Sequence, residues 1–176
     1  SSGNPMQIKF LLGCTALLLA LSGPARADEA TVRPEVGRPL QAAQELIRAG
    51  KYKEAIARLK ELDAVPNKTA QENFVAERMR GAALAGAGDA EGAAKSLEAV
   101  IVANRLPAAE QLRTHEALVG AWYRARDYAK AVAAGQRYLR EGGSNPQIRT
   151  VIAQAQYLTD DFAGADGDVD AVDHRA

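Results

Sequence analysis

A six-residue motif recurs along this chain at nearly constant intervals, and it constrains the fold more than any other feature of the sequence. The motif reads GKYKEA at 50–55, GDAEGA at 88–93, RDYAKA at 126–131 and DDFAGA at 160–165. The final alanines of these segments lie 38, 38 and 34 residues apart. A period of this length is typical of an array of helical hairpins, in which each unit buries its apolar face against its neighbours.

Each unit is predicted to consist of a helix, a tight turn and a second helix. In the first unit, apolar residues recur at helical spacing before and after Gly50, which can adopt the left-handed conformation that ends a helix. The abundance of alanine and an aromatic content of 5% favour closely packed helices over a sheet. In the fourth unit the second helix would contain Gly164 and Gly167, each costing about 1 kcal/mol, so we expect it to fray or to be a stub.

Two stretches, LVGAWY at 118–123 and DYAKA at 127–131, together resemble the tetratricopeptide repeat, as does GKYKEAI at 50–56. The resemblance covers the chain from about Val36 to Ala165. It implies an all-α fold, a right-handed superhelical solenoid of about three to four antiparallel helical hairpins. The sequence departs from the repeat pattern at Gly120, which falls one position late, and at Ala90, where an aromatic residue is usual.

The N-terminal segment has the pattern of an export signal. Residues 1–5 precede the first methionine and are interpreted as a cloning remnant, and 6–27 are predicted to be a signal peptide. Its apolar run at 10–21 is short for a membrane span, and Ala25 and Ala27 match the cleavage rule. We expect a leader at 28–36, the repeat domain at 37–165 and an acidic flexible tail at 166–176. The predicted location is the periplasm or the exterior.

Cys14 provides an alternative to cleavage after Ala27. It follows Leu11, Leu12 and Gly13 as in a lipobox, so the chain could instead be lipid-anchored through this cysteine. The residues after it stay apolar, which favours the cleaved signal. After cleavage we expect no stable membrane span, and no cysteine would remain for a disulfide or a thiol nucleophile.

Charge and motif content argue against nucleic-acid binding and against catalysis. The 22 basic and 22 acidic residues balance, whereas nucleic-acid binders normally carry a cationic excess. His115 is interpreted as a helix-surface histidine, because no nucleophile or HExxH spacing accompanies it. Asp166, Asp168 and Asp170 alternate as in a calcium loop, but Ala171 stands where that loop needs glycine. We therefore predict no enzyme, no cofactor and no metal.

The resemblance implies a binding surface on the first helix of each hairpin, which in this family lines a concave groove. The asparagines and lysines with which some of these proteins hold a C-terminal carboxylate are missing, so that clamp is not predicted. Arginine and tyrosine, which are effective in protein interfaces, are frequent among the carried-over positions. These positions, the predicted groove, are Gln44, Arg48, Arg78, Arg113, Glu116, Tyr123, Arg124, Gln154 and Tyr157, with Ala82 and Thr150 beside them.

The sequence thus predicts an interaction scaffold of the cell envelope that binds a peptide or a partner subunit in this groove. The exposed apolar end of a short array could also associate with a second copy. The alternative is a structural role, in which the chain is the N-terminal part of a longer array and the function lies in further repeats.

Overall fold

The computed structural model describes the backbone of residues 31–172 and the side chains through Asp160. The predicted cloning remnant, the signal peptide, the lipobox cysteine Cys14 and the last residues of the predicted tail lie outside this part. From Val32 onward the chain forms one compact unit.

This part of the chain is helical and contains no strand, which confirms the predicted all-α class. The first helix begins with a proline, a residue that suits the first turn because its missing N–H has no helical partner there. The elements are α2 (Pro34–Arg48), α3 (Tyr52–Lys60), the short 3₁₀ helix η1 (Glu61–Ala64), α4 (Ala70–Gly86), α5 (Ala90–Ala103), α6 (Ala108–Arg124), α7 (Tyr128–Arg140) and α8 (Pro146–Val172).

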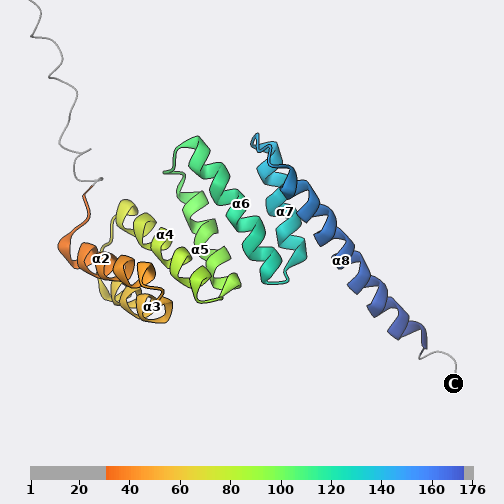
Figure 1. Ribbon diagram of the computed structural model, residues 1–176, viewed down its shortest axis with the longest axis horizontal. Coiled ribbons are helices and arrows are strands. Elements are labelled where there is room, and N and C mark those ends of the chain that lie inside the picture. Colours follow the sequence, from red (N-terminus) through yellow and green to blue (C-terminus); the bar gives the residue numbers. More distant parts are fainter. Residues whose placement is uncertain (1–30, 173–176) are drawn as a thin grey trace, which may run out of the picture. The chain divides into compact units, whose positions relative to one another are not determined.

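Helices that follow one another in the sequence pack side by side (Figure 1). Three hairpins result, α2–α3, α4–α5 and α6–α7, and α8 packs against α7 and α6. Contacts between α3 and α4 and between α5 and α6 join each hairpin to the next. The structure therefore shows the predicted succession of hairpins, whereas the right-handed superhelix remains a prediction.

The three hairpin turns share one backbone conformation. Gly50, Gly88 and Arg126 have φ values of 74°, 84° and 62°, in the left-handed region. This arrangement is a Schellman motif, which satisfies carbonyls left without partners at a helix end. In each turn the N–H of the next residue donates to a carbonyl five residues back, namely Lys51 to Leu46 at 2.8 Å, Asp89 to Leu84 at 2.9 Å and Asp127 to Trp122 at 3.0 Å.

Small residues occupy equivalent buried positions on the helices after these turns. Ala55, Ala93 and Ala131, the final alanines of the repeated motif, are 0%, 1% and 0% exposed. At Gly135 of α7, an added Cβ would lie 2.6 Å from the Cγ1 atom of Ile152 in α8. Two helices can approach this closely only where one of them carries a small residue. The distance between neighbouring helices therefore depends on these alanines and glycines.

The fourth copy of the motif does not form a turn. We predicted a hairpin at 160–165, but α8 continues through this segment as one helix of 27 residues, and the predicted acidic tail begins inside it. A turn would bring a second helix back onto the array, yet residues 166–170 offer little apolar surface to bury there. Two glycines lower helix propensity but, unlike proline, they leave the helical hydrogen bonds intact.

The shared turn conformation makes opposite predictions for two substitutions. Gly88→Ala should lower the free energy of unfolding by about 1 kcal/mol, because an alanine is strained at this φ. A Cβ there meets nothing within 4 Å, so the loss would reflect the backbone alone. Arg126→Gly should instead raise it by about 0.5 kcal/mol, since relief of strain exceeds the added freedom of the unfolded chain.

Denaturant unfolding of the purified variants measures both effects. Gly37→Ala is the matched control, because Gly37 lies inside α2 and alanine should stabilise a helix there. If Gly88→Ala were as stable as Gly37→Ala, the left-handed turn would be contradicted.

Candidate functional site

The predicted groove residues all lie on the first helices of the hairpins or on α8. α2 packs against α4, and α6 packs against α8. The residues therefore lie on two pairs of helices, and the two helices of each pair are in contact. Ala82 and Thr150 are exposed on α4 and α8. The groove residues are Gln44 and Arg48 on α2, Arg78 on α4, Arg113, Glu116, Tyr123 and Arg124 on α6, and Gln154 and Tyr157 on α8.

Six of these residues are exposed and have no ion pair or side-chain hydrogen bond within the described part of the chain. Tyr157 is 71% exposed. We refer to the six as the first-helix face. They are Gln44, Arg48, Arg113, Arg124, Gln154 and Tyr157.

The other three groove residues make contacts inside the protein. The Arg78 guanidinium lies 3.6 Å from a Glu110 carboxylate oxygen and 5.7 Å from the centre of the Phe74 ring. The Tyr123 ring meets the Tyr128 ring edge-on at 5.4 Å between centroids. These contacts connect neighbouring helices, and a role of the same residues in partner binding stays a prediction.

Glu116 holds the loop between α7 and α8. Its carboxylate accepts a hydrogen bond of 2.6 Å from the Tyr138 hydroxyl and one of 3.3 Å from the Asn145 side-chain amide. The backbone N–H of Asn145 in turn donates to the Tyr138 oxygen at 3.0 Å. The hydrogen bond to Glu116, together with burial, raises the pKa of Tyr138. This network positions the start of α8 against the third hairpin.

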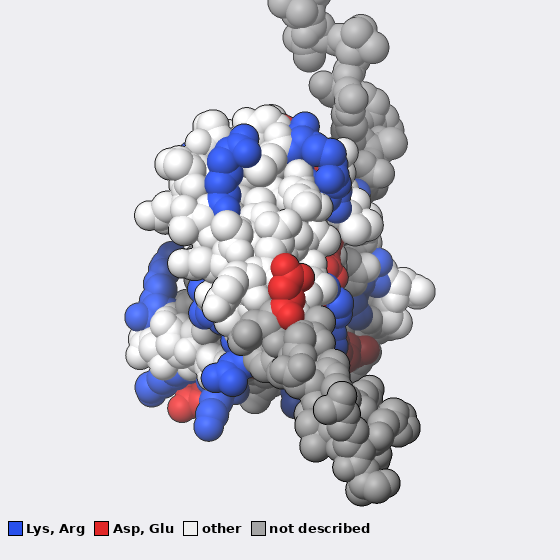
Figure 2. All heavy atoms as spheres, turned by 90° about the vertical axis from the view of Figure 1, so that its right-hand side faces the viewer, with Lys and Arg blue, Asp and Glu red and all other residues white. Residues whose placement is uncertain are grey.

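A surface view from the side of α8 shows how charge is arranged around this helix (Figure 2). The surface is largely uncharged, with Lys and Arg side chains around it and few carboxylates. Among the exposed α8 side chains, Gln147, Thr150, Ala153, Gln154 and Tyr157 are uncharged, whereas Arg149 and Asp160 carry charge. The described side chains of α8 therefore offer polar amides and a tyrosine for contact, with one arginine and one aspartate among them.

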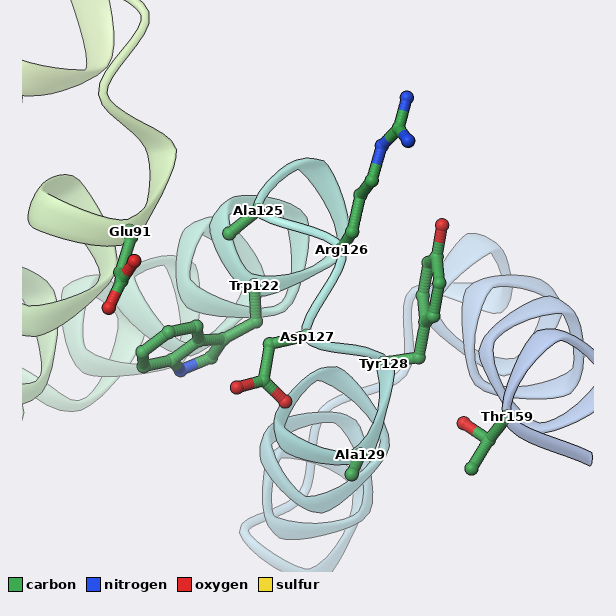
Figure 3. A pocket seen from close by; sticks show the side chains of 8 residues that line it. All are labelled: Glu91, Trp122, Ala125, Arg126, Asp127, Tyr128, Ala129 and Thr159. Carbon is green, nitrogen blue, oxygen red and sulfur yellow. The ribbon is translucent and has the colours of Figure 1, made fainter. Parts of the chain in front are cut away.

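A pocket of about 410 Å³ lies beside the α6–α7 turn (Figure 3). Its two ends differ in chemistry. Trp122, Asp127 and Glu91 lie on one side of the turn, whereas the Arg126 and Tyr128 side chains project together on the other. The lining residues are Glu91, Trp122, Ala125, Arg126, Asp127, Tyr128, Ala129 and Thr159.

Trp122 is fixed by polar and cationic neighbours. Its indole N–H donates to a Glu98 carboxylate oxygen at 3.1 Å, and the Lys130 ammonium lies 4.4 Å from the ring centre. Only 2% of Trp122 is exposed. The indole is thus a rigid wall of the pocket and part of the core.

This pocket was not predicted from the sequence. Trp122, Tyr128 and Arg126 belong to the repeat and its turn, and Thr159 comes from α8 through tertiary packing alone. The sequence did contain one sign of an unusual third turn, because Arg126 stands where the first two copies of the motif have glycine.

His115 is fully buried, so its interpretation as a helix-surface residue was wrong. It lies on the inner side of α6 with Leu118, Val119 and Trp122, at spacings of three, four and seven residues. This helical spacing was a signal that its polar character obscured. Its Nε2 atom is 2.7 Å from a Glu141 carboxylate oxygen, yet neither ring nitrogen has an aligned hydrogen bond within the described residues.

Burial lowers the pKa of His115, and Arg137 acts in the same direction, whereas the Glu141 carboxylate opposes the shift. The histidine is therefore neutral near pH 7. The neutral imidazole is therefore buried on the inner side of α6, with Glu141 and Arg137 from the end of α7 as its charged neighbours.

Glu72 is a second fully buried ionisable group, and it connects the start of α4 with Arg33, the residue that precedes α2. It belongs to a capping box at the start of α4, in which its carboxylate accepts from the Thr69 N–H at 2.9 Å. The Arg33 guanidinium donates to the same carboxylate at 3.0 and 3.1 Å, and to the carbonyls of Pro66 and Asn67. The hydrogen bonds from Arg33 and then Thr69 lower the pKa of Glu72 to about 2.

Comparisons with known proteins identified no relative: no protein-family model, no curated protein and no solved structure matches the chain. None of the described helices is both long and apolar enough to cross a membrane. Within the same part of the chain, no group of three or more His, Cys, Asp or Glu side chains could hold a metal ion.

Because His115 and Glu72 are buried, we expect the protein to lose stability in two separate ranges of acidic pH. His115 is neutral when folded, so stability should fall as pH drops below 6.5, where the unfolded chain takes up a proton first. Glu72 is ionised when folded, so a further loss should occur as pH falls from 4.5 towards about 2.

Thermal unfolding followed from pH 7 to pH 3 measures both losses. Glu72→Gln should lower the melting temperature by several degrees at pH 7, because an amide cannot replace the ionic hydrogen bonds to Arg33. It should also flatten the profile below pH 4.5. Glu110→Gln is the control, since this glutamate is partly exposed. Equal profiles for the two variants would contradict the role assigned to Glu72.

Proposed function

We propose that this chain is a non-enzymatic interaction scaffold of the cell envelope, built from tetratricopeptide-like hairpins that form a right-handed superhelix. It binds a peptide or a partner subunit along the first-helix face. The protein reaches the periplasm or the exterior through its N-terminal signal. The proposal rests on the repeat period, the three equivalent turns and the chemistry of the exposed side chains.

The observation that carries the proposal is the state of three exposed arginines. The three arginines of the first-helix face, Arg48, Arg113 and Arg124, have no ion pair within the described residues. Arg78 and Arg80 on α4 are paired, and several cations of the second helices are paired locally. These pairs are Arg58 with Glu61, Lys95 with Glu91, Lys130 with Asp127 and Arg137 with Glu141.

Unpaired arginines favour binding because a partner does not have to displace an existing intramolecular contact. A guanidinium can donate two parallel hydrogen bonds to a carboxylate or to backbone carbonyls and can also stack on flat groups. Tyr157 adds a large amphipathic surface that loses little side-chain entropy on binding. Gln44 and Gln154 can both donate to and accept from an extended backbone.

The proposal predicts where a partner will crosslink. A photo-reactive residue placed at Arg113, Gln154 or Tyr157 should capture a specific protein in cells that produce the chain. The same residue at Lys95 or Gln136, which are also exposed but lie on the second helices α5 and α7, should capture little. Capture from Gln154 or Tyr157 should weaken about tenfold when Arg113 and Arg124 are both replaced by alanine.

Thermal unfolding of the double variant provides the folding control, since both arginines are exposed. Specific capture confined to Lys95 and Gln136, or equal capture at all five positions, would contradict the proposed face.

A further inference from the structure

The zero net charge of the chain conceals a strong separation of charge along it. Residues 31–159 contain 19 Lys and Arg against 14 Asp and Glu, whereas 160–173 contain six Asp and no Lys or Arg. All but the last of these aspartates belong to α8, which runs to Val172. The described body of the protein is therefore basic, and the distal part of its last helix is acidic.

The distal part of α8 extends beyond the helices on which it packs (Figure 1). α8 has 27 residues, whereas its neighbours α6 and α7 have 17 and 13. At about 1.5 Å per residue these lengths are roughly 40, 26 and 20 Å. The buried residues among its described side chains are Ile148, Ile152 and Ala155, all in the proximal half. An acidic helix end of this kind gains from a cationic surface, because its like charges repel one another.

One cation, Arg126, lies at one end of the pocket. Arg126 keeps a left-handed backbone conformation that is unfavourable for arginine, although glycine serves at the equivalent turn positions Gly50 and Gly88. Its guanidinium has no ion pair or hydrogen bond within the described residues and projects beside the Tyr128 ring (Figure 3). Thr159 of α8 lines the same pocket.

The acidic residues of the pocket do not neutralise this end. Asp127 lies 3.4 Å from the Lys130 ammonium and accepts from the Lys130 backbone N–H at 3.2 Å. Glu91 lies 3.0 Å from the Lys95 ammonium. Both carboxylates already have cationic partners, and both lie on the opposite side of the turn from Arg126.

We propose that the Arg126 and Tyr128 end of the pocket binds the aspartate-rich end of α8, residues 160–173, from a second copy of this chain. The guanidinium donates paired hydrogen bonds to an aspartate carboxylate, and the tyrosine ring covers the apolar side of the contact. Two copies can exchange these contacts reciprocally and form a dimer. The inference goes beyond the proposed function, because it uses none of the residues of the first-helix face.

Sedimentation equilibrium of the purified chain tests the proposal. The average mass should rise with concentration at about 50 mM salt, and self-association should weaken about tenfold at about 500 mM, where surface charges are screened. Arg126→Gly should weaken it to a similar degree without unfolding the protein, because glycine suits the left-handed turn. Replacing Asp166, Asp168 and Asp170 together by asparagine should have the same effect.

Arg140→Gln is the matched control. It also removes one exposed arginine that has no ion pair among the described side chains, but from the far end of α7, so association should change less than about twofold. A chain that stays monomeric at low salt, an Arg126→Gly variant that associates normally, or a control that weakens association as much would overturn the proposal. So would loss of association in the asparagine variant but not in Arg126→Gly, since the acidic end would then bind elsewhere.

Charge reversal distinguishes direct pairing from a general effect of charge. Arg126→Asp, which the left-handed turn tolerates, and a variant with lysine at 166, 168 and 170 should each associate poorly alone. Mixed in equal amounts they should form a heterodimer, and absence of that heterodimer would overturn the proposal. Crosslinking from Arg113 in the Arg126→Gly background reports separately on the first-helix face, so failure of one proposal is distinguishable from failure of the other.

Discussion

Close approach of helices at small residues is the constraint on which the rest of this structure depends. No hairpin here has a helix longer than 17 residues, and such a pair cannot bury its own apolar side. Burial therefore comes from neighbours, and the neighbours can approach because Ala55, Ala93 and Ala131 occupy the equivalent inner position of each second helix. At Gly135 the space for Ile152 exists only because glycine has no side chain. A larger residue at these positions would separate the helices along their length.

Small residues determine how closely the helices pack. The polar side chains of this protein have two other roles. Some connect successive elements, as Glu116 does with Tyr138 and Asn145, and as Glu72 does with Arg33. Others project from the first helices without a polar partner among the described residues, which is the basis of the proposed binding face. The acidic end of α8 and the arginine at the third turn are opposite in charge, which is the basis of the proposed contact between two copies. Recognition would thus involve residues that folding does not require.

The sequence was sufficient to predict the all-α class and the succession of hairpins, because the turn motif combines a left-handed residue with small residues at fixed spacing. It was not sufficient for α8, where the fourth motif suggested a turn and the structure has a continuous helix. A turn is favoured when the helix that follows it has apolar surface to bury. Residues 166–170 have little, and this depends on the whole segment and not on the turn motif. His115 was misassigned because its polarity was given more weight than its spacing. The pocket depends on Thr159 meeting the third turn, a contact that no local pattern predicts.

Distances between equivalent positions of the three turns test the ordered stacking of hairpins most directly. Lys53, Glu91 and Ala129 are exposed and lie 38 residues apart, so spin labels can be attached in pairs at cysteines placed there, with Cys14 replaced by serine. With helices about 10 Å apart, labels on neighbouring hairpins should be roughly 20 Å apart, and those at 53 and 129 roughly 40 Å apart. A 53-to-129 distance no longer than the two neighbouring distances would contradict the stacked array.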